Sequence, residues 1–154
     1  MASRKQNSQL NTVFLDPEKW ISELASAREN AKILQSLPST FGGSLRAHLK
    51  RRRMSQERCA EAMLTSSRTI SRIINNDEYE VDKDKAFAAC VALQLPLEMC
   101  TDMMRKANCP LGSSARDVVL LRLLEDADQL NVETCNMILK GLGCRPLNLR
   151  DSAA

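Results

Sequence analysis

Arginines and small hydroxyl side chains that could contact a phosphate or a base edge gather in one short run, Ser66-Ser67-Arg68-Thr69-Ile70-Ser71-Arg72-Ile73-Ile74. Helical spacing places the isoleucines of this run on one face, so its other face points outward. The outward face then carries Ser67, Arg68, Ser71 and Arg72. An arginine in such a position can donate two hydrogen bonds to one guanine, which is worth about 1–3 kcal/mol of discrimination between bases. The run therefore predicts a contact with nucleic acid.

Positive charge is concentrated around this run. The whole chain of 154 residues has a net charge of +3, but residues 45–72 contain eight basic and two acidic side chains, a net charge of +6. The rest of the chain is therefore slightly acidic, at −3. A basic block inside a slightly acidic protein is expected to bind a polyanion.

No pattern of catalytic residues accompanies the basic block. The sequence has no glycine-rich phosphate loop and no nucleophile beside a base. Its single histidine, His48, lies on or beside the apolar face of a predicted helix. We therefore expect a protein that is not an enzyme, with no cofactor and no small-molecule substrate, in which His48 is structural.

Four of the six cysteines form two pairs with eight intervening residues, Cys100 with Cys109 and Cys135 with Cys144. Four thiolates could hold a zinc ion. The two cysteines of a structural zinc pair usually have only about two to four intervening residues, however. Cysteine is also a small apolar core residue. We expect buried free thiols and no metal site.

Composition favours an all-α protein outside the membrane. Apolar residues make up 44% of the chain and charged residues 27%, as in globular proteins, whereas aromatic residues are only 3%, which disfavours strands. No apolar stretch approaches the roughly 20 residues that cross a bilayer, and residues 1–10 are polar. We expect a cytoplasmic protein with reduced thiols and no membrane partner.

Capping residues and apolar spacing predict the helices. Asp16 and Pro17 begin an amphipathic helix over 17–36, with a hydrophobic staple between Leu15 and Trp20. A second helix is expected over 43–53, followed by two short helices over 56–63 and 67–74. Ser55 and Ser66 are the N-caps of these short helices, which a tight turn joins. Two short helices of this kind are typical of a helix-turn-helix.

Residues 54–75 resemble the lambda-repressor-like (XRE) family of helix-turn-helix regulators. The resemblance rests on Met54-Ser55-Gln56, Ala60-Glu61, Ser66, Ile70-Ser71-Arg72-Ile73 and Asn75, and it extends over about Phe41 to Leu97, where residues 82–97 supply the closing helix. It implies a lambda-repressor-like helix-turn-helix bundle that regulates transcription by binding double-stranded DNA, with residues 66–74 in the major groove. The protein would then be an all-α bundle with an N-terminal helix and a C-terminal helical extension.

The resemblance and the exposed face together define the expected contacts with DNA. Arg68 is the first candidate for a base contact, Ser66 caps the recognition helix, and Gln56 matches a position that touches the backbone or the first base in the family. The full set is Gln56, Ser66, Ser67, Arg68, Thr69, Ser71, Arg72 and Asn75, with Arg52, Arg53 and Arg58 as phosphate contacts. Since one such module buries too little surface for selective binding, we expect a homodimer built by the N-terminal helix, the 114–128 helix, or both.

The sequence departs from the family pattern at several points. Leu64 and Arg53 stand where the family usually has glycine. After the recognition helix the family usually has Asn-Gly, whereas this sequence has Asn75-Asn76. This replacement is tolerable because asparagine accepts left-handed geometry. The loop 77–80 is Asp-Glu-Tyr-Glu, and its three carboxylates would repel phosphate. The alternative function is therefore a helix-turn-helix fold used as a protein-protein interaction module that does not bind DNA.

An internal repeat follows the predicted DNA-binding domain. Residues 95–104 are echoed 35 positions later by residues 130–139, and each unit is expected to be a short helix with an extended Pro-Leu exit. The apolar helix between them, 114–128, is expected to be buried within the subunit or in a dimer. We expect three parts: a tail and amphipathic helix (1–38), a DNA-binding domain (39–97) and a C-terminal extension (98–154).

Overall fold

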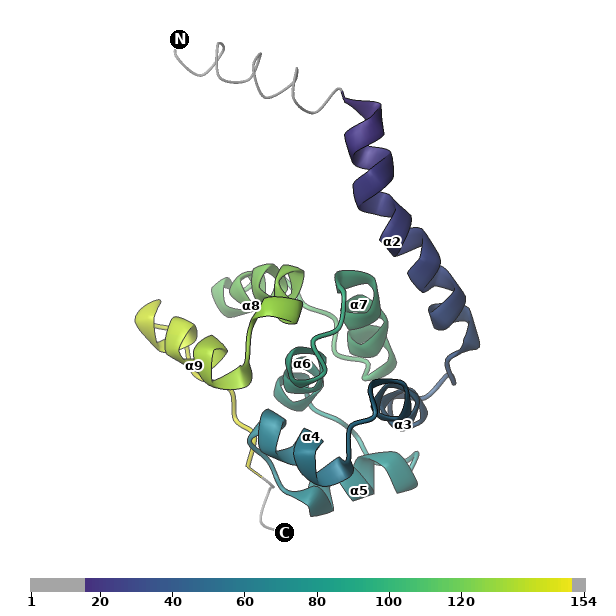
Figure 1. The fold of residues 1–154 in the computed structure, drawn as a ribbon. Coiled ribbons are helices and arrows are strands. Elements are labelled where there is room, and N and C mark those ends of the chain that lie inside the picture. Colours follow the sequence, from purple (N-terminus) through teal and green to yellow (C-terminus); the bar gives the residue numbers. More distant parts are fainter. Residues whose placement is uncertain (1–15, 151–154) are drawn as a thin grey trace. The chain divides into compact units, whose positions relative to one another are not determined.

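The structure is a computed structural model that describes residues 16–150. These residues form eight α-helices and one 3-10 helix and contain no strand, which confirms the predicted all-α class. None of the helices in this part of the chain is both long and apolar enough to cross a membrane. In order they are α2 (Pro17–Ser36), α3 (Phe41–Arg52), α4 (Gln56–Met63), α5 (Ser67–Asn75), α6 (Lys83–Ala92), α7 (Leu97–Lys106), α8 (Ala115–Glu125), η1 (Ala127–Gln129) and α9 (Val132–Gly141) (Figure 1).

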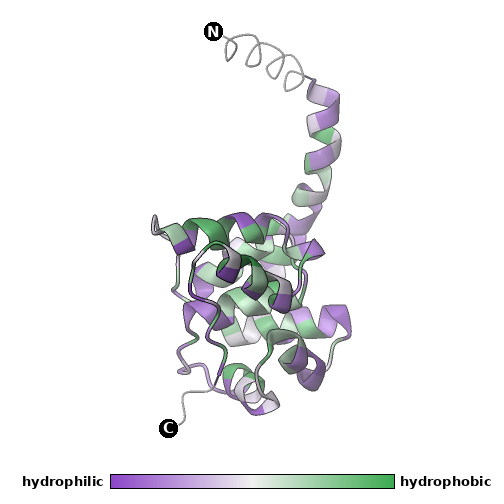
Figure 2. Cartoon of the chain, turned by 90° about the vertical axis from the view of Figure 1, so that its left-hand side faces the viewer, coloured by the Kyte–Doolittle hydropathy of each residue, from purple (hydrophilic) through white to green (hydrophobic). Residues whose placement is uncertain are grey.

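The chain divides into two compact units, with the boundary between Gln35 and Ser36. In its described part the first unit is a single helix, α2, which begins at Pro17 as predicted. None of the residues of α2 is buried, and hydrophobic and hydrophilic residues both occur along it (Figure 2). Leu15, the predicted staple partner of Trp20, lies outside the described residues. The expected divisions at 38/39 and 97/98 stay predictions.

The second unit is built around α6. This helix packs against α4, α7, α8 and α9 and lies at the centre of the unit (Figure 1). Its residues 86–90 are fully buried, with Phe87 the largest side chain among them. A helix that is apolar around its circumference is stable in such a place because every face has an apolar neighbour.

The helix α3 begins two residues earlier than the sequence suggested. We expected a turn up to Gly43, but α3 begins at Phe41 because the Thr40 hydroxyl accepts a hydrogen bond from the backbone N–H of Gly43 at 3.0 Å. Gly42 is therefore helical, and it is buried against α5. A Cβ atom at Gly42 would overlap the carbonyl oxygen of Ile73, so only glycine allows this approach of the two backbones.

Two of the departures from the family pattern fall on left-handed residues. Arg53, after α3, has φ 54°, and Leu64, after α4, has φ 57°. Glycine adopts this conformation without the steric cost that a Cβ atom adds. Asn76 differs from expectation, because it is extended (φ −131°) rather than left-handed. Its side-chain oxygen instead accepts a hydrogen bond from the backbone N–H of Glu78 at 3.0 Å and so forms a local turn.

The internal repeat corresponds to α7 and α9. Each helix is followed by a left-handed residue, Asn108 (φ 56°) and Gly143 (φ 72°), which lie 35 positions apart. The next residue then closes the turn: Cys109 N–H donates to the carbonyl of Met104, and Cys144 N–H donates to that of Leu139. The two units thus end their helices with the same backbone geometry.

The helix between the repeats is less buried than its composition suggested. Leu120 and Leu124 of α8 are buried, but Val118 and Leu121 are 48% and 45% exposed. One face of α8 is therefore not buried within the subunit, and burial of that face in a dimer, the other expected location, stays a prediction. The apolar residues outnumber the positions that face α6, α7 and α9, so the surplus lies on the surface.

Candidate nucleic-acid interface

The helix α5 is held by a polar cap at its start and an apolar face on its inner side. The Ser66 hydroxyl accepts a hydrogen bond from the backbone N–H of Thr69 at 3.2 Å, as predicted. Ile70, Ile73 and Ile74 are buried where α5 packs against α3 and α4. These contacts fix which face of α5 meets solvent.

The outer face of α5 carries four of the predicted contact residues. Ser67, Arg68 and Arg72 are exposed, and Ser71 is half-buried. Within the part of the chain that the structure describes, no ion pair involves Arg68 or Arg72. Both guanidinium groups are therefore presented to solvent with their donors available for a base edge or a phosphate.

Thr69 was wrongly included among the DNA-contacting residues. Its side chain is fully buried, and its hydroxyl lies 3.0 Å from the Ser66 hydroxyl. The outward face predicted from the helical spacing consisted of Ser67, Arg68, Ser71 and Arg72 and did not include Thr69. Here the hydrogen bond satisfies the hydroxyl inside the protein, so burial costs little.

The carboxyl end of α5 contains a polar network that joins it to α3. The Asn75 amide donates to the Ser71 hydroxyl at 3.1 Å, and Arg46 of α3 donates to the Asn75 side-chain oxygen at 3.0 Å. Arg46 is exposed and lies next to the predicted surface, although it was not among the predicted site residues. Its place in the basic block was the only sequence signal, since the contact spans 29 positions.

The predicted phosphate contacts are not equivalent. Gln56 and Arg58 are exposed on the first turn of α4, and Arg53 is exposed at the end of α3. Arg52 instead donates a hydrogen bond to the carbonyl of Gln94 at 2.7 Å, in the turn between α6 and α7. We expect Arg52 to be the least available of the arginines in the predicted set.

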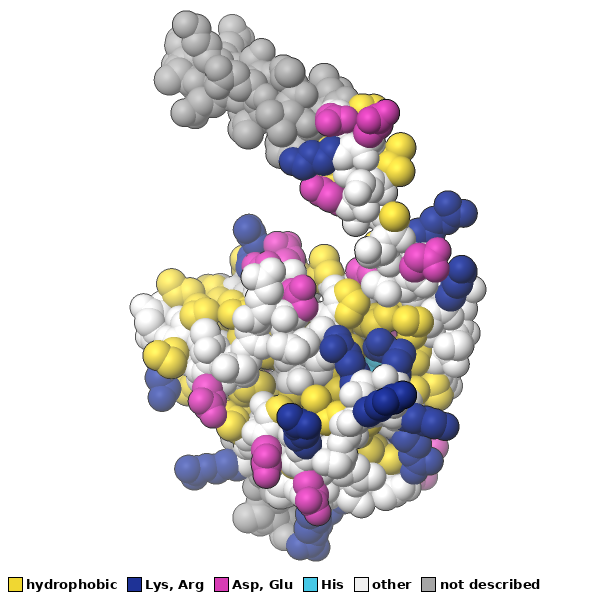
Figure 3. All heavy atoms as spheres, in the orientation of Figure 1, with side chains coloured by type: hydrophobic (Ala, Val, Ile, Leu, Met, Phe, Trp, Pro, Cys, Tyr) yellow, Lys and Arg dark blue, Asp and Glu magenta, His cyan; other side chains and the backbone are white. Residues whose placement is uncertain are grey.

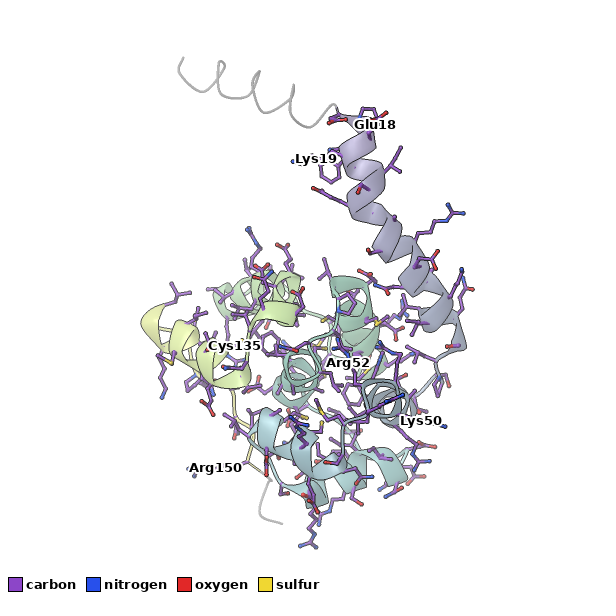
Figure 4. The ribbon with its side chains drawn as sticks, viewed as in Figure 1. Glu18, Lys19, Lys50, Arg52, Cys135 and Arg150 are labelled. Atoms are coloured by element: carbon purple, nitrogen blue, oxygen red, sulfur yellow. The ribbon has the colours of Figure 1, made fainter. Side chains whose placement is uncertain are left out.

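Basic side chains gather over α3, as the space-filling view shows (Figure 3). Lys50 and Arg52 both extend from this helix (Figure 4). His48 is fully buried beneath them, with its Nδ1 atom 2.8 Å from Arg51. Burial, together with the neighbouring Arg51, lowers the pKa of His48 to about 4, so the imidazole is neutral at pH 7 and adds no charge to the basic surface.

The acidic loop after α5 borders a groove that the start of α3 also lines. Asp77, Glu78 and Glu80 are exposed, and with Lys106 and the start of α3 they line a groove of about 700 Å³. The loop begins at the carboxyl end of α5, whereas Ser66 and Ser67 lie at its amino end. A helix of nine residues separates the two ends by about 13 Å.

None of the six cysteines belongs to α5. Cys59, Cys90, Cys100 and Cys135 are buried, and Cys109 and Cys144 are half-buried. Burial raises the pKa of Cys59 and Cys135 to about 11, which keeps both protonated. Among residues 16–150, no group of three or more histidine, cysteine, aspartate or glutamate side chains is arranged to hold a metal ion.

Comparisons of this chain with protein-family models, with curated proteins and with solved structures find no match.

Proposed function

We propose that this protein is a sequence-specific regulator that binds double-stranded DNA and inserts α5 into the major groove. The observation that carries the proposal is the division of α5 into two faces: three isoleucines are buried, while Ser67, Arg68 and Arg72 are exposed. The order of α4, turn and α5, with Ser55 and Ser66 as caps, agrees with the resemblance to the XRE family. We propose that the protein acts as a homodimer, because one helix-turn-helix domain offers too small a surface for selective binding.

The contacts divide by what each can recognise. Arg68, in the first turn of α5, donates to a guanine edge, and Arg72 reaches a base or a phosphate one turn later. Gln56 and Arg58 at the start of α4 contact the sugar-phosphate backbone, as does Arg53. Arg46 adds a further phosphate contact beside the carboxyl end of α5. The positive end of the α5 dipole favours a phosphate near Ser66.

Replacing Arg68 by alanine should lower the preference for a cognate site more than it lowers the affinity for bulk DNA. The loss of one bidentate contact to guanine is worth about 1–3 kcal/mol, or roughly 5- to 150-fold in the ratio of the two affinities. The measurement is a selection of bound fragments from random duplexes, followed by titration of the selected and random duplexes at two salt concentrations.

The control for this change is Arg122→Ala, which removes an exposed arginine from α8. It should leave the ratio of affinities unchanged. An equal loss by Arg68→Ala on every duplex would assign Arg68 to the phosphates. If the wild-type protein is not retained on any duplex at low ionic strength, the proposed function is wrong.

A second function is favoured by the acidic loop. Three exposed carboxylates beside a groove suit a protein partner with basic side chains, and they repel DNA. In this second function the fold is a protein-protein interaction module. The partner protein would bind in the groove, and α5 would not bind DNA.

Changing Asp77, Glu78 and Glu80 together to the corresponding amides distinguishes the two functions. If the loop lies near the DNA backbone, removal of three negative charges should tighten binding to any duplex by about fivefold at low salt, and less as salt increases. The affinity is measured at two salt concentrations. An unchanged affinity places the loop away from DNA, and loss of a bound protein partner in the same variant would support the interaction module.

A further inference from the structure

The amphipathic helix α2 carries an apolar seam that repeats every seven residues. The seam residues are Trp20, Leu24, Ala27, Ala31 and Leu34, separated in turn by four, three, four and three positions. This is the spacing of the d and a positions of a heptad, with Trp20 at d and Leu24 at a. An apolar repeat of 3.5 residues is the spacing that packs one helix along another in a left-handed supercoil.

The state of α2 in the structure shows why it needs such a partner. None of its 20 residues is buried: of the seam residues, Trp20 and Leu24 are 38% and 56% exposed, and Ala27, Ala31 and Leu34 are half-buried. Most of the stability of a protein helix comes from packing of its apolar face rather than from its intrinsic helix propensity. A helix with this seam therefore gains stability when a second apolar surface covers it.

The charges beside the seam identify that second surface as another copy of α2. Glu23 occupies the g position and Arg28 the e position of the next heptad. In a parallel pair, g of one helix faces the following e of the other, so Glu23 of each copy meets Arg28 of its partner. An antiparallel pair brings g to g and e to e, and it leaves these opposite charges apart. The complementarity is thus specific to the parallel arrangement.

We propose that two copies of this protein associate through a parallel two-stranded coiled coil formed by α2. Trp20, Leu24 and Leu34 fill its seam, the small Ala27 and Ala31 let the helices approach closely, and two Glu23–Arg28 pairs set the orientation. Because the seam covers only about two and a half heptads, the pair forms in a concentration-dependent way. This inference names the interface of the dimer that DNA recognition calls for, but it is tested without DNA.

The test uses the full chain and two single charge reversals, Glu23→Arg and Arg28→Glu. Each homodimer then contains two like-charge pairs in place of two opposite-charge pairs, which should weaken dimerisation by about tenfold. An equimolar mixture of the two variants restores both opposite-charge pairs in the heterodimer, so it should dimerise as the wild type does. Sedimentation equilibrium over a range of concentrations measures the association.

The matched control is Glu29→Arg, which makes the same charge change at the outward f position. It breaks an exposed ion pair with Lys32 (3.2 Å) and should leave dimerisation unchanged. The single tryptophan provides a second measurement, since the emission of Trp20 should shift to the blue as the wild-type protein is concentrated and the seam closes.

Three outcomes would overturn the proposal. One is a wild-type chain that stays monomeric at every concentration. A second is dimerisation by both charge reversals with wild-type affinity, which would place the interface elsewhere, for instance on the exposed Val118 and Leu121 of α8. A third is a mixture that associates no better than its components, which would exclude the parallel Glu23–Arg28 pairing. Duplex retention by the wild type in any of these cases leaves the DNA-binding proposal standing.

Discussion

Replacing Gly42 by alanine should lower the free energy of unfolding by about 3 kcal/mol, at the upper end of what overpacking costs. The added Cβ atom overlaps the carbonyl oxygen of Ile73, and neither α3 nor α5 can relieve this by rotating a side chain, because the contact is with backbone. The two helices must move apart, which also shifts the exposed face of α5. Urea denaturation followed by far-UV circular dichroism measures the change.

The matched control for this change is Gly141→Ala at the end of α9. A Cβ atom there meets nothing within 4 Å, so the substitution removes only the flexibility of glycine. It should raise the free energy of unfolding by up to about 0.5 kcal/mol, since alanine is the better helix former. If Gly42→Ala is as stable as this control, the backbones of α3 and α5 are not in contact at Gly42 and Ile73.

Replacing Arg116 by methionine should also destabilise the protein by about 3 kcal/mol. Arg116 donates two hydrogen bonds, of 2.9 and 3.1 Å, to the carboxylate of Asp84. Asp84 is only 8% exposed. Removal of the arginine leaves that carboxylate buried without a counter-charge, which is the costly way to break a buried pair. The midpoint of urea unfolding gives the size of the effect.

The same substitution should loosen the C-terminal segment. Arg116 donates to the carbonyls of Arg145 and Pro146, and Asp84 accepts a hydrogen bond from the backbone N–H of Asn148 at 2.8 Å. These bonds hold the extended segment that follows α9 against α6 and α8. Amide hydrogen exchange at Asn148 should therefore become faster in Arg116→Met than global unfolding alone would explain.

Two further variants make this prediction specific. Arg122→Met changes the same residue type on the same helix, but the Arg122 side chain is 75% exposed and its partner Glu125 is 47% exposed, so stability should change by less than about 0.5 kcal/mol. The double variant Asp84→Asn with Arg116→Met removes the orphaned charge and should recover at least about 1 kcal/mol of the loss. A double variant that is no more stable than Arg116→Met would show that the buried charge is not the cause.

Local sequence features were sufficient to place the starts of α2, α4 and α5. The start of α2 at Pro17 and the caps Ser55 and Ser66 were predicted, because a cap involves only a side chain and an N–H group three positions away. The apolar faces of α3, α4 and α5 were also predicted from periodicity, with Leu45, Met63 and Ile70 now fully buried. The outward position of Arg68 and Arg72 follows from the same periodicity.

Three features escaped prediction because a contact joins residues far apart in the chain. Gly42 was assigned to a turn because its partner, Ile73, lies 31 positions away. The hydrogen bonds of Arg46 to Asn75 and of Arg52 to Gln94 span 29 and 42 positions, so nothing in the sequence placed Arg46 beside α5 or ranked Arg52 below the other arginines as a candidate contact. A single sequence contains no signal for such pairs.

By itself the sequence determined the all-α class, the caps, the apolar stripes and the basic block, since each depends on residue type and on spacing within a few turns. Only the tertiary structure decided which polar groups are buried. Thr69 turns inward because Ser66 satisfies its hydroxyl, and Asp84 lies in the interior because Arg116 comes to it from 32 positions away. The physical reason is that the cost of burying a polar group depends on the partner it finds, and folding supplies that partner.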